Sequence, residues 1–261
     1  MIKAKKSLGQ NFLIDKNVLE KIVKVTPVKG KNILEIGPGT GNLTSYILKE
    51  NPKKITVIEK DNDLVIKLGH LFKNKLKIIN CDILDIDETS LFNDKVTVFG
   101  NLPYNISTEI LSKWIMNIKD TFWFNDLVLM FQKEVAERIT ANFNTSNYGR
   151  LSILSQWKLN VRKICEIKSA SFSPKPKIDS TLLLFTPKKN FIKIKNSNNL
   201  EKITRIFFSN KRKMIKKPYN QIFNGDMRVL EMLKINLNLR PQNLSYETYY
   251  KLTEEYEILN S

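Results

Sequence analysis

The residues best suited to chemistry lie in the stretch "NLPYN", residues 101–105, directly after the strand-like run "VTVFG". Pro103 fixes its own φ angle and stiffens this loop. The side-chain oxygen of Asn101 can accept a hydrogen bond, and the ring of Tyr104 offers a flat face on which a base can stack. A simple turn requires neither group, so the stretch predicts a loop that binds or activates a ligand.

A second candidate is the glycine-rich stretch "EIGPGTG", which follows the short apolar run "NILEI". Glycines such as Gly37 and Gly39 let the backbone turn sharply and approach a ligand without a Cβ clash. The helix expected next offers unpaired N–H groups to an anionic part of that ligand. The pattern alone fits a plain strand-to-helix turn as well, because such turns are common.

Two carboxylates sharpen the interpretation of the glycine loop. Glu59 ends the second expected strand, 22 residues after Gly37, where an acid can accept hydrogen bonds from ribose hydroxyls. Asp82 ends the third, where a carboxylate can accept from an adenine amino group. Both acids could instead be solvated strand ends or helix caps. The spacing G-x-G-x-G favours S-adenosylmethionine over a dinucleotide, because S-adenosylmethionine has no pyrophosphate to hold.

With a methyl donor in place, the loop 101–105 fits the activation of an adenine amine. That amine is a poor nucleophile because its lone pair is delocalised into the ring. The Asn101 oxygen can accept from one of its N–H groups, and a backbone carbonyl at Leu102 or Pro103 from the other. No strong general base is required, so the expected mechanism is positioning plus electrostatics.

The elements that must position these residues alternate between strands and helices, which predicts an α/β fold with a parallel sheet. We expect strands at 32–36, 54–61, 76–83, 95–101 and 126–131, and helices at 17–25, 42–50, 64–72, 106–116 and 132–140. Two further strand-like runs, 158–167 and 178–187, are separated by a loop too short for a crossover helix. They are expected to pair in the antiparallel sense.

The character of the chain changes after Pro187, where a basic, Asn-rich stretch reads as a linker. From about Leu200 the pattern is helical. We therefore expect a catalytic domain over residues 1–188 and a helical RNA-binding domain over 189–261. Pro218 is expected to interrupt the basic helix in which it lies.

The charge balance points to a polyanionic partner. Lys and Arg number 43 against 26 Asp and Glu, a net charge of +17, which favours nucleic acid first and an anionic membrane second. Between Lys158 and Arg228 there are 18 basic residues and only four acids. Within this region we expect phosphate contacts from Lys211, Arg212, Lys213, Lys216 and Lys217, although a solvated helix face is the usual fate of such a run.

Metal sites, disulfides and membrane spans find no support in the sequence. The two cysteines, Cys81 and Cys165, have no metal-ligand spacing, and His70 is the single histidine. The longest apolar runs are far too short to cross a bilayer. These observations predict a reduced, cytoplasmic protein that needs no metal and no membrane.

Taken together, several motifs resemble one known family. They are "KKSLGQNFL" (5–13), "EIGPGTGNLT" (35–44), "VIEKD" (57–61), "CDILDID" (81–87), "FGNLPYNIS" (99–107), "FQKEVAERI" (131–139), "YGRLS" (148–152) and "FSPKPKIDS" (172–180). In this order and spacing they are similar to the ribosomal RNA adenine N6,N6-dimethyltransferases, above all the bacterial members that act on 16S rRNA. The resemblance covers nearly the whole chain.

The resemblance implies a Rossmann-like, seven-stranded S-adenosylmethionine-dependent methyltransferase sheet with a small all-α C-terminal domain. It implies dimethylation of two adjacent adenosines in the 3′-terminal hairpin loop of 16S rRNA, in an immature 30S subunit, by an enzyme that is a monomer when free. By matching position, the implied cofactor-binding residues are Asn11, Leu13, Gly37, Glu59, Asp82 and Asn101. Asn101 and Tyr104 match the target-amine loop, and Phe172 matches the aromatic expected on the other face of a flipped base.

Three other functions stay open. A 23S rRNA adenine methyltransferase would share the aromatic and Asn-Pro-Tyr loops, but "SLGQNFL", "GPGTG" and "LRPQNLS" favour the small-subunit enzyme. A non-catalytic RNA-binding assembly factor would keep the fold, but the chemical residues are all present. An adenine-N6 DNA methyltransferase usually has Pro where Leu102 stands, and the sequence lacks a recognisable target-recognition insert.

Overall fold

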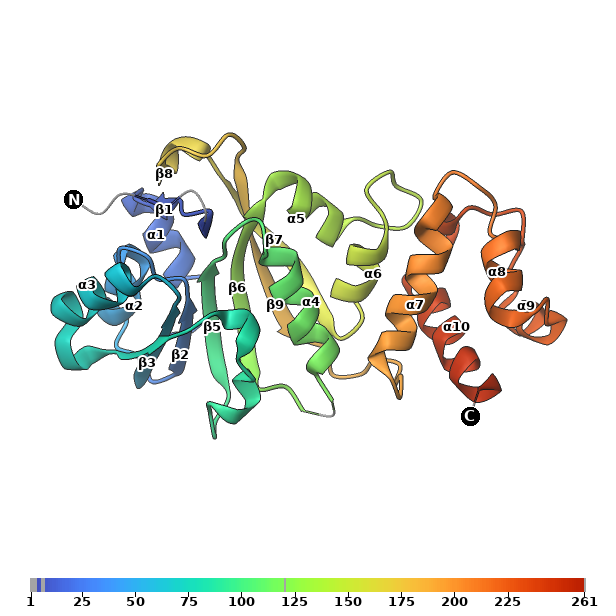
Figure 1. Ribbon diagram of the computed structural model, residues 1–261, viewed down its shortest axis with the longest axis horizontal. Helices are drawn as coiled ribbons and strands as arrows, with labels where there is room; N and C mark the ends of the chain where they lie inside the picture. The colour runs from blue at the N-terminus through green and yellow to red at the C-terminus, as the bar shows by residue number, and fades with distance from the viewer. Residues whose placement is uncertain (1–3, 6–7, 120, 261) are drawn as a thin grey trace. The chain divides into compact units, whose positions relative to one another are not determined.

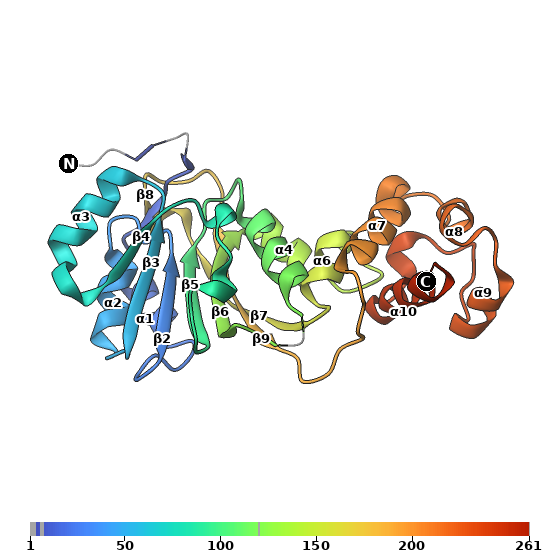
Figure 2. The same ribbon diagram turned by 60° about the horizontal axis from the view of Figure 1, so that its bottom comes forward.

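The structure is a computed structural model that describes residues 4–5, 8–119 and 121–260. Lys6 and Ser7 of the motif "KKSLGQNFL" lie outside the described residues. Contacts within the chain divide it into two compact units (Figures 1 and 2). The first unit comprises residues 1–113, 118–136 and 161–187, and the second comprises 114–117, 137–160 and 188–261. One change of unit therefore falls at Pro187, and two earlier segments also belong with the second unit.

The first unit is built on a seven-stranded sheet with the order β4-β3-β2-β5-β6-β9-β7. The strands are β2 (Asn32–Ile36), β3 (Lys54–Glu59), β4 (Lys77–Asn80), β5 (Val96–Asn101), β6 (Phe124–Gln132), β7 (Leu159–Ile167) and β9 (Ser180–Pro187). The strands from β2 to β6 pair in parallel, and β9 pairs antiparallel to β6. The predicted α/β class and its seven-stranded sheet are thereby confirmed.

Helices follow these strands as the alternation predicted. They are α1 (Lys16–Val23), α2 (Asn42–Lys49), α3 (Asn62–Phe72), α4 (Ser107–Asn117) and α5 (Lys133–Thr140). Leu19 of α1 and Ile47 of α2 share one apolar cluster with Val57 and Phe99 of the sheet. Residues at the intervening strand positions, such as Leu34, are buried as well. Both faces of the sheet are therefore covered, which explains the continuous apolar runs of the central strands.

The last two strands run antiparallel, as expected. The Lys188 amide, just after β9, donates to the Lys158 carbonyl just before β7 at 2.9 Å. At the other end, the Ser169 amide after β7 donates to the Asp179 carboxylate before β9 at 2.9 Å. The start of each strand therefore lies beside the end of the other.

The sequence pattern missed a second, two-stranded sheet. Strand β1 (Phe12–Leu13) pairs antiparallel with β8 (Phe172–Ser173), so that Leu13 faces Phe172. The Ser171 hydroxyl donates to Asp15, the N-cap residue of α1, at 2.9 Å. This pairing fixes an N-terminal segment, residues 8–13, which we call the arm.

The second unit contains α6 (Arg150–Ser155), α7 (Ser197–Phe207), α8 (Lys216–Phe223), α9 (Met227–Leu233) and α10 (Tyr246–Leu259). The basic stretch before α7 is not a free linker. The Glu257 carboxylate accepts the backbone amides of Lys195 and Asn196 at 2.7 and 2.8 Å, and the Trp157 indole donates to the Ile192 carbonyl at 2.9 Å. Buried partners therefore hold this stretch against its own unit.

The expected interruption at Pro218 was wrong. Pro218 is the third residue of α8, which begins at Lys216. Amides in the first turn of a helix have no partner within the helix, so a residue without an N–H group is tolerated there. Residues 211–213 precede this helix and do not share a helix face with Lys216 and Lys217.

Membrane-spanning helices and metal-binding clusters are absent from the part of the chain that the structure describes. None of the described helices is long and apolar enough to cross a membrane. In the same part of the chain, no group of three or more His, Cys, Asp or Glu side chains is arranged to hold a metal ion.

Candidate active site

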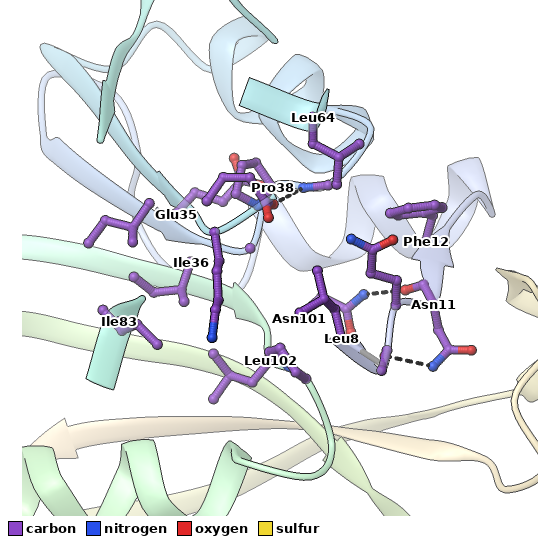
Figure 3. Close-up of a pocket in the computed structure, with 18 of the residues that line it drawn as sticks. Leu8, Asn11, Phe12, Glu35, Ile36, Pro38, Leu64, Ile83, Asn101 and Leu102 are labelled. Atoms are coloured by element: carbon purple, nitrogen blue, oxygen red, sulfur yellow. Dashed lines mark hydrogen bonds between the residues drawn. The ribbon is translucent and has the colours of Figure 1, made fainter. Parts of the chain in front are cut away.

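A cavity of about 190 Å³ opens in the first unit, at the carboxyl ends of the parallel strands (Figure 3). Strands β3 and β4 lie on one side of β2, and β5 and β6 lie on the other. The reversal of strand order between β2 and β5 is the place where α/β sheets bind ligands. Predicted residues that line the cavity are Asn11, Leu13, Gly37, Gly39, Glu59, Asp82, Asn101 and Tyr104.

The glycine loop needs its glycines for two reasons. Gly37 and Gly39 have φ angles of 63° and 59°, a backbone conformation that favours glycine. A Cβ atom at Gly39 would lie 2.8 Å from the ring of Phe12, which belongs to the arm. A side chain at position 39 would therefore displace the arm from the cavity wall.

Glu59 ends β3 and is 7% exposed. One of its oxygens accepts the Asp61 amide at 2.9 Å, and the other accepts the Gly39 amide at 3.2 Å. Burial raises the pKa of this carboxyl, and the two amide hydrogen bonds oppose that shift. Each carboxylate oxygen retains accepting capacity toward the cavity, because it can take more than one hydrogen bond.

Asp82 lines the same cavity but has other partners. Its carboxylate accepts the Leu84 amide at 3.0 Å as the N-cap of a short 3₁₀ turn (Ile83–Asp85), and it forms an ion pair with Lys60 at 2.7 Å. The Lys60 ammonium holds the pKa of Asp82 below its usual value. Asp82 is thus a helix cap that also lines the cavity, and its contact with an adenine amino group stays a prediction.

Asn101 is oriented by the arm. Its side-chain nitrogen donates to the Asn11 carbonyl at 2.8 Å (Figure 3). A carbonyl can only accept, so the contacting atom must be the amide nitrogen and the Asn101 oxygen is left for other donors. The Asn11 amide in turn donates to the Gly9 carbonyl at 3.1 Å. The arm therefore sets the direction of the oxygen that the proposed chemistry would use.

Tyr104 is anchored through its hydroxyl, which lies 2.6 Å from the Ser180 hydroxyl at the start of β9. Burial raises the pKa of Tyr104, and the Ser180 hydrogen bond opposes this shift. The phenol stays neutral near pH 7, so the ring can act only as a surface and a hydrogen-bonding group. Sequence reasoning missed Ser180, whose hydroxyl gave no signal that linked it to Tyr104.

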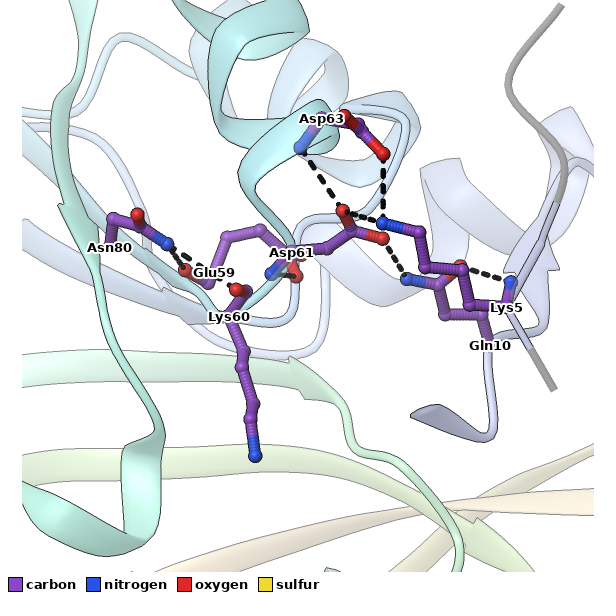
Figure 4. A network of polar contacts seen from close by, with 7 residues as sticks. All are labelled: Lys5, Gln10, Glu59, Lys60, Asp61, Asp63 and Asn80. Carbon is purple, nitrogen blue, oxygen red and sulfur yellow. Dashed lines mark hydrogen bonds and ion pairs between the residues drawn. The ribbon is translucent and has the colours of Figure 1, made fainter. Parts of the chain in front are cut away.

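The arm is fastened by a polar network on Asp61, the N-cap residue of α3 (Figure 4). The Asp61 carboxylate accepts the Lys5 ammonium at 2.7 Å and the Gln10 amide at 2.9 Å. Burial alone would raise the pKa of Asp61, but these hydrogen bonds outweigh burial and hold it below its usual value. Nearer the cavity, the Asn42 amide donates to the Leu13 carbonyl at 2.7 Å.

Phe172 is buried beside the arm. Its side chain is 3% exposed, belongs to the apolar cluster under the sheet, and is not part of the cavity wall. In this arrangement Phe172 pairs with Leu13 across β1 and β8 and anchors the arm. Its predicted contact with one face of a target base stays a prediction.

Sequence reasoning also missed Glu35, which reads as one position of a buried strand. Glu35 is 2% exposed, lines the cavity and accepts the Thr44 hydroxyl at 2.7 Å. Burial raises the pKa of this carboxyl to about 8, with a further contribution from Glu59. A charged residue in an otherwise apolar strand was the signal available in the sequence.

We expect Glu35→Gln to change the pH dependence of stability. Below about pH 4.5 the carboxyl is protonated in both the folded and the unfolded chain. Between about 4.5 and 8 only the folded chain retains the proton, so wild-type stability falls as the pH rises through this window. Glutamine has no titrating proton. The free energy of unfolding of the variant, relative to that of wild type, should therefore rise by a few kcal/mol between pH 5 and pH 9.

Denaturant unfolding of both proteins at pH 5, 7 and 9 measures this difference. Glu254→Gln, on the exposed face of α10, is the matched control. Parallel pH curves for wild type and Glu35→Gln would show that Glu35 does not titrate in this range.

The basic residues predicted to contact RNA lie in the second unit. Arg212, Lys213, Lys216 and Lys217 are exposed. Lys211 is half-buried instead, and its ammonium donates to the carbonyls of Ser146 and Tyr148 at 2.5 and 2.6 Å. Lys211 therefore holds the loop 146–148, and four of the five predicted cations are open to solvent.

Comparison with known proteins identifies the family of this chain. Residues 1–257 match the family model described as ribosomal RNA adenine dimethylase. The chain is 66% identical to the ribosomal RNA small subunit methyltransferase A of Pelagibacter ubique (strain HTCC1062), over 99% of this chain and 98% of that protein. It is 42% identical to the enzyme of that name from Wolbachia sp. subsp. Drosophila simulans (strain wRi), over 99% and 96% of the two chains.

Two solved structures share the fold of this chain. A dimethyladenosine transferase from Plasmodium falciparum superposes with a TM-score of 0.81 at 29% identity, covering 95% of this chain and 98% of that one. The 23S rRNA methyltransferase ErmE superposes with a TM-score of 0.70 at 19% identity, covering 95% of this chain and 100% of that one, a likeness of fold.

The sheet order and the cavity at its carboxyl ends define the class as an S-adenosylmethionine-dependent methyltransferase. Within that class, the chain belongs to the ribosomal RNA adenine dimethylase family.

Proposed function

We propose that this enzyme transfers methyl groups from S-adenosylmethionine to the N6 amines of two adjacent adenosines in the 3′-terminal hairpin loop of 16S rRNA. The products are N6,N6-dimethyladenosines, made during maturation of the small subunit. The observation that carries the proposal is the orientation of Asn101, whose amide nitrogen is bound to the Asn11 carbonyl and whose oxygen is left to accept from an amine. The names of the curated relatives support the choice of subunit.

The residues of the cavity fit S-adenosylmethionine. The backbone at Gly37 and Gly39 has positive φ angles and no Cβ atom, so it can approach a ligand closely. The carboxylates of Glu59 and Asp82 suit the hydroxyl and amino donors of an adenosine. Asn11 and Leu13 of the arm line the remaining wall. When bound, S-adenosylmethionine supplies an electrophilic methyl group on a positively charged sulfur.

The protein's contribution to the reaction is to shape the amine. Asn101 accepts one of the two N–H groups of the adenine, and a carbonyl at Leu102 or Pro103 accepts the other. Hydrogen bonds to both favour a pyramidal nitrogen whose lone pair is no longer delocalised into the ring. Because these acceptors are fixed before the substrate arrives, they stabilise the charge that develops on nitrogen without reorganising. The proton leaves to solvent after the transfer.

Tyr104 provides the surface that holds the base. A base must leave its stack to reach the cavity, and this costs least in a loop. Stacking on the Tyr104 ring offsets part of that cost, and the Ser180 hydroxyl keeps the ring in place. Tyr104 acts on the target base, so cofactor binding should not depend on it.

We expect Tyr104→Ala to fold and to bind S-adenosylmethionine as wild type does, and to lower kcat/KM for RNA by about 10- to 100-fold, because base stacking contributes about 1–3 kcal/mol. Tyr104→Phe keeps the ring and loses only the hydroxyl contact with Ser180, so its loss should be several-fold. Steady-state methylation of 30S subunits measures both. A wild-type rate in Tyr104→Ala would remove the stacking role.

The second unit is proposed to contact the rRNA through Arg212, Lys213, Lys216 and Lys217, which are exposed and carry no acid between them. We propose that the free enzyme is a monomer and acts in the cytoplasm, on an immature 30S subunit.

One experiment tests the assignment of substrate. Unmethylated 30S and 50S subunits are incubated separately with the enzyme and labelled methyl donor, and the modified nucleotides are mapped by mass spectrometry. Two adjacent N6,N6-dimethyladenosines near the 3′ end of 16S rRNA are expected. Label on 50S alone would instead assign a 23S rRNA substrate, and label on neither would favour a non-catalytic assembly factor.

A further inference from the structure

The first unit carries a second concave feature, outside the cofactor cavity. It is an open groove of about 610 Å³ between α1 and β7, both visible in Figure 1. We call it the basic groove. Its lining residues are Asn17, Glu20, Lys21, Lys24, Val25, Arg162, Lys163 and Ile164. Four of the eight are cations and one is an acid.

The cations come from two elements with different local reasons to carry them. Lys21 lies in the last turn of α1 and Lys24 is its C-cap residue, where positive charge is favoured by the helix dipole. Arg162 and Lys163 lie on β7, the terminal strand of the sheet order, and no helix end favours positive charge there. The stability of α1 therefore accounts for two of the four cations, Lys21 and Lys24, and not for the two on β7.

Most of this charge is not neutralised by protein groups. Lys163 forms an ion pair with Glu166 at 2.8 Å. Among the described residues, Lys21, Lys24 and Arg162 make no ion pair, and all three are exposed. Glu20 is the single carboxylate in the lining. A concave surface with several unpaired cations raises the local concentration of anions.

The shape of the groove distinguishes the kind of anion. The groove is open to solvent, and its lining includes residues from Asn17 to Val25 along α1 and just beyond, which suits a stretch of polymer better than an enclosed small molecule. Val25 and Ile164 are half-buried and give it a partly apolar floor, as a sugar–phosphate backbone can use. The excess of basic residues in the chain, +17 overall, agrees with a polyanionic partner.

We propose that the basic groove binds the phosphate backbone of the RNA substrate. The choice of rRNA as that polyanion rests on the proposed function. Because the groove and the cofactor cavity belong to the same unit, the contact would hold the RNA on the catalytic unit itself. It would act in addition to the cations of the second unit.

Neutralising the groove tests the proposal. The triple variant Lys21→Gln, Lys24→Gln, Arg162→Gln is compared with Lys54→Gln, Lys75→Gln, Lys77→Gln, which removes three exposed cations elsewhere in the first unit. Binding of a transcript of the 16S rRNA 3′ domain is measured by filter retention at several salt concentrations. The groove variant should bind at least about tenfold more weakly at 0.1 M salt, and its log–log salt slope should be shallower by about 2.

A variant that should bind RNA more tightly provides an independent test. Glu20→Gln removes the one acid of the groove and should tighten binding of the same transcript by about two- to fivefold. Glu50→Gln, at the end of α2, makes the same change of charge outside the groove and should leave affinity near wild type.

The outcomes separate this proposal from the proposed function. An unchanged affinity for S-adenosylmethionine establishes that each variant is folded. If the groove triple variant binds RNA as its control does, the basic groove is not an RNA-binding site, even if wild type methylates 30S subunits. A wild type that methylates neither subunit, with RNA binding still lost in the groove variant, would overturn the substrate assignment and leave the groove as an RNA site.

Discussion

Asn101→Ala is expected to lower kcat for methyl transfer by about 100- to 1000-fold, the usual effect of removing one preorganised polar group from a transition state. The substitution removes the oxygen that, in the proposed mechanism, accepts from the target amine. It also removes the donor to the Asn11 carbonyl, which lies 2.8 Å away and belongs to the arm. Cofactor affinity should therefore weaken several-fold in addition.

Single-turnover methylation of 30S subunits at saturating cofactor separates these two effects. Asn105→Ala is the matched control, since Asn105 lines the same cavity four residues further along the loop and is exposed. If Asn101→Ala kept more than a tenth of the wild-type rate, the amine would have to be activated by another group.

The second large effect is expected at Glu59. Glu59→Ala should raise the Kd for S-adenosylmethionine by about 100-fold, because hydrogen bonds to a charged acceptor contribute about 1.5–3 kcal/mol each. The carboxylate also accepts the Gly39 and Asp61 amides, so its loss loosens the glycine loop at the same time. Glu59→Gln keeps one carbonyl oxygen but sets an NH₂ group against one of these amides, so we expect an intermediate loss.

Isothermal titration calorimetry with S-adenosylmethionine measures the three affinities. Asp82→Ala provides the comparison within the cavity. Asp82 already has the Leu84 amide and the Lys60 ammonium as partners, so its removal should cost less than that of Glu59. Equal losses at the two positions would contradict this ranking, and no loss at Glu59 would falsify its assignment to the cofactor.

The sheet could be predicted because its signals are local. The short apolar run "NILEI" is followed directly by a glycine-rich turn, and β2 matches the expected range of 32–36. The pairing of β1 with β8 could not be predicted, because each strand has two residues and they lie about 160 positions apart. A strand of two residues has no period, and its partner is selected by tertiary packing.

The same distinction holds for the site. Glu59 and Asn101 end their strands and Asp82 comes just after its strand. Parallel strands bring their carboxyl ends to one edge of a sheet, so the positions of these residues in the sequence predict that they lie close together. The burial of Phe172 beside Leu13 could not be predicted, because the neighbouring serine and proline give no sign of it. Ser180 was missed because its partner, Tyr104, comes from another part of the chain.

The arm has a consequence for local stability. It is held by a two-residue ladder and by a few side-chain hydrogen bonds, notably from Asn42 and Asn101, and not by a continuous sheet. Segments fastened in this way unfold locally at a small fraction of the global free energy of unfolding. In native-state hydrogen exchange, the amides of residues 8–13 should therefore exchange long before those of β5. A ligand that fills the adjoining cavity should be detected first as slower exchange in this segment.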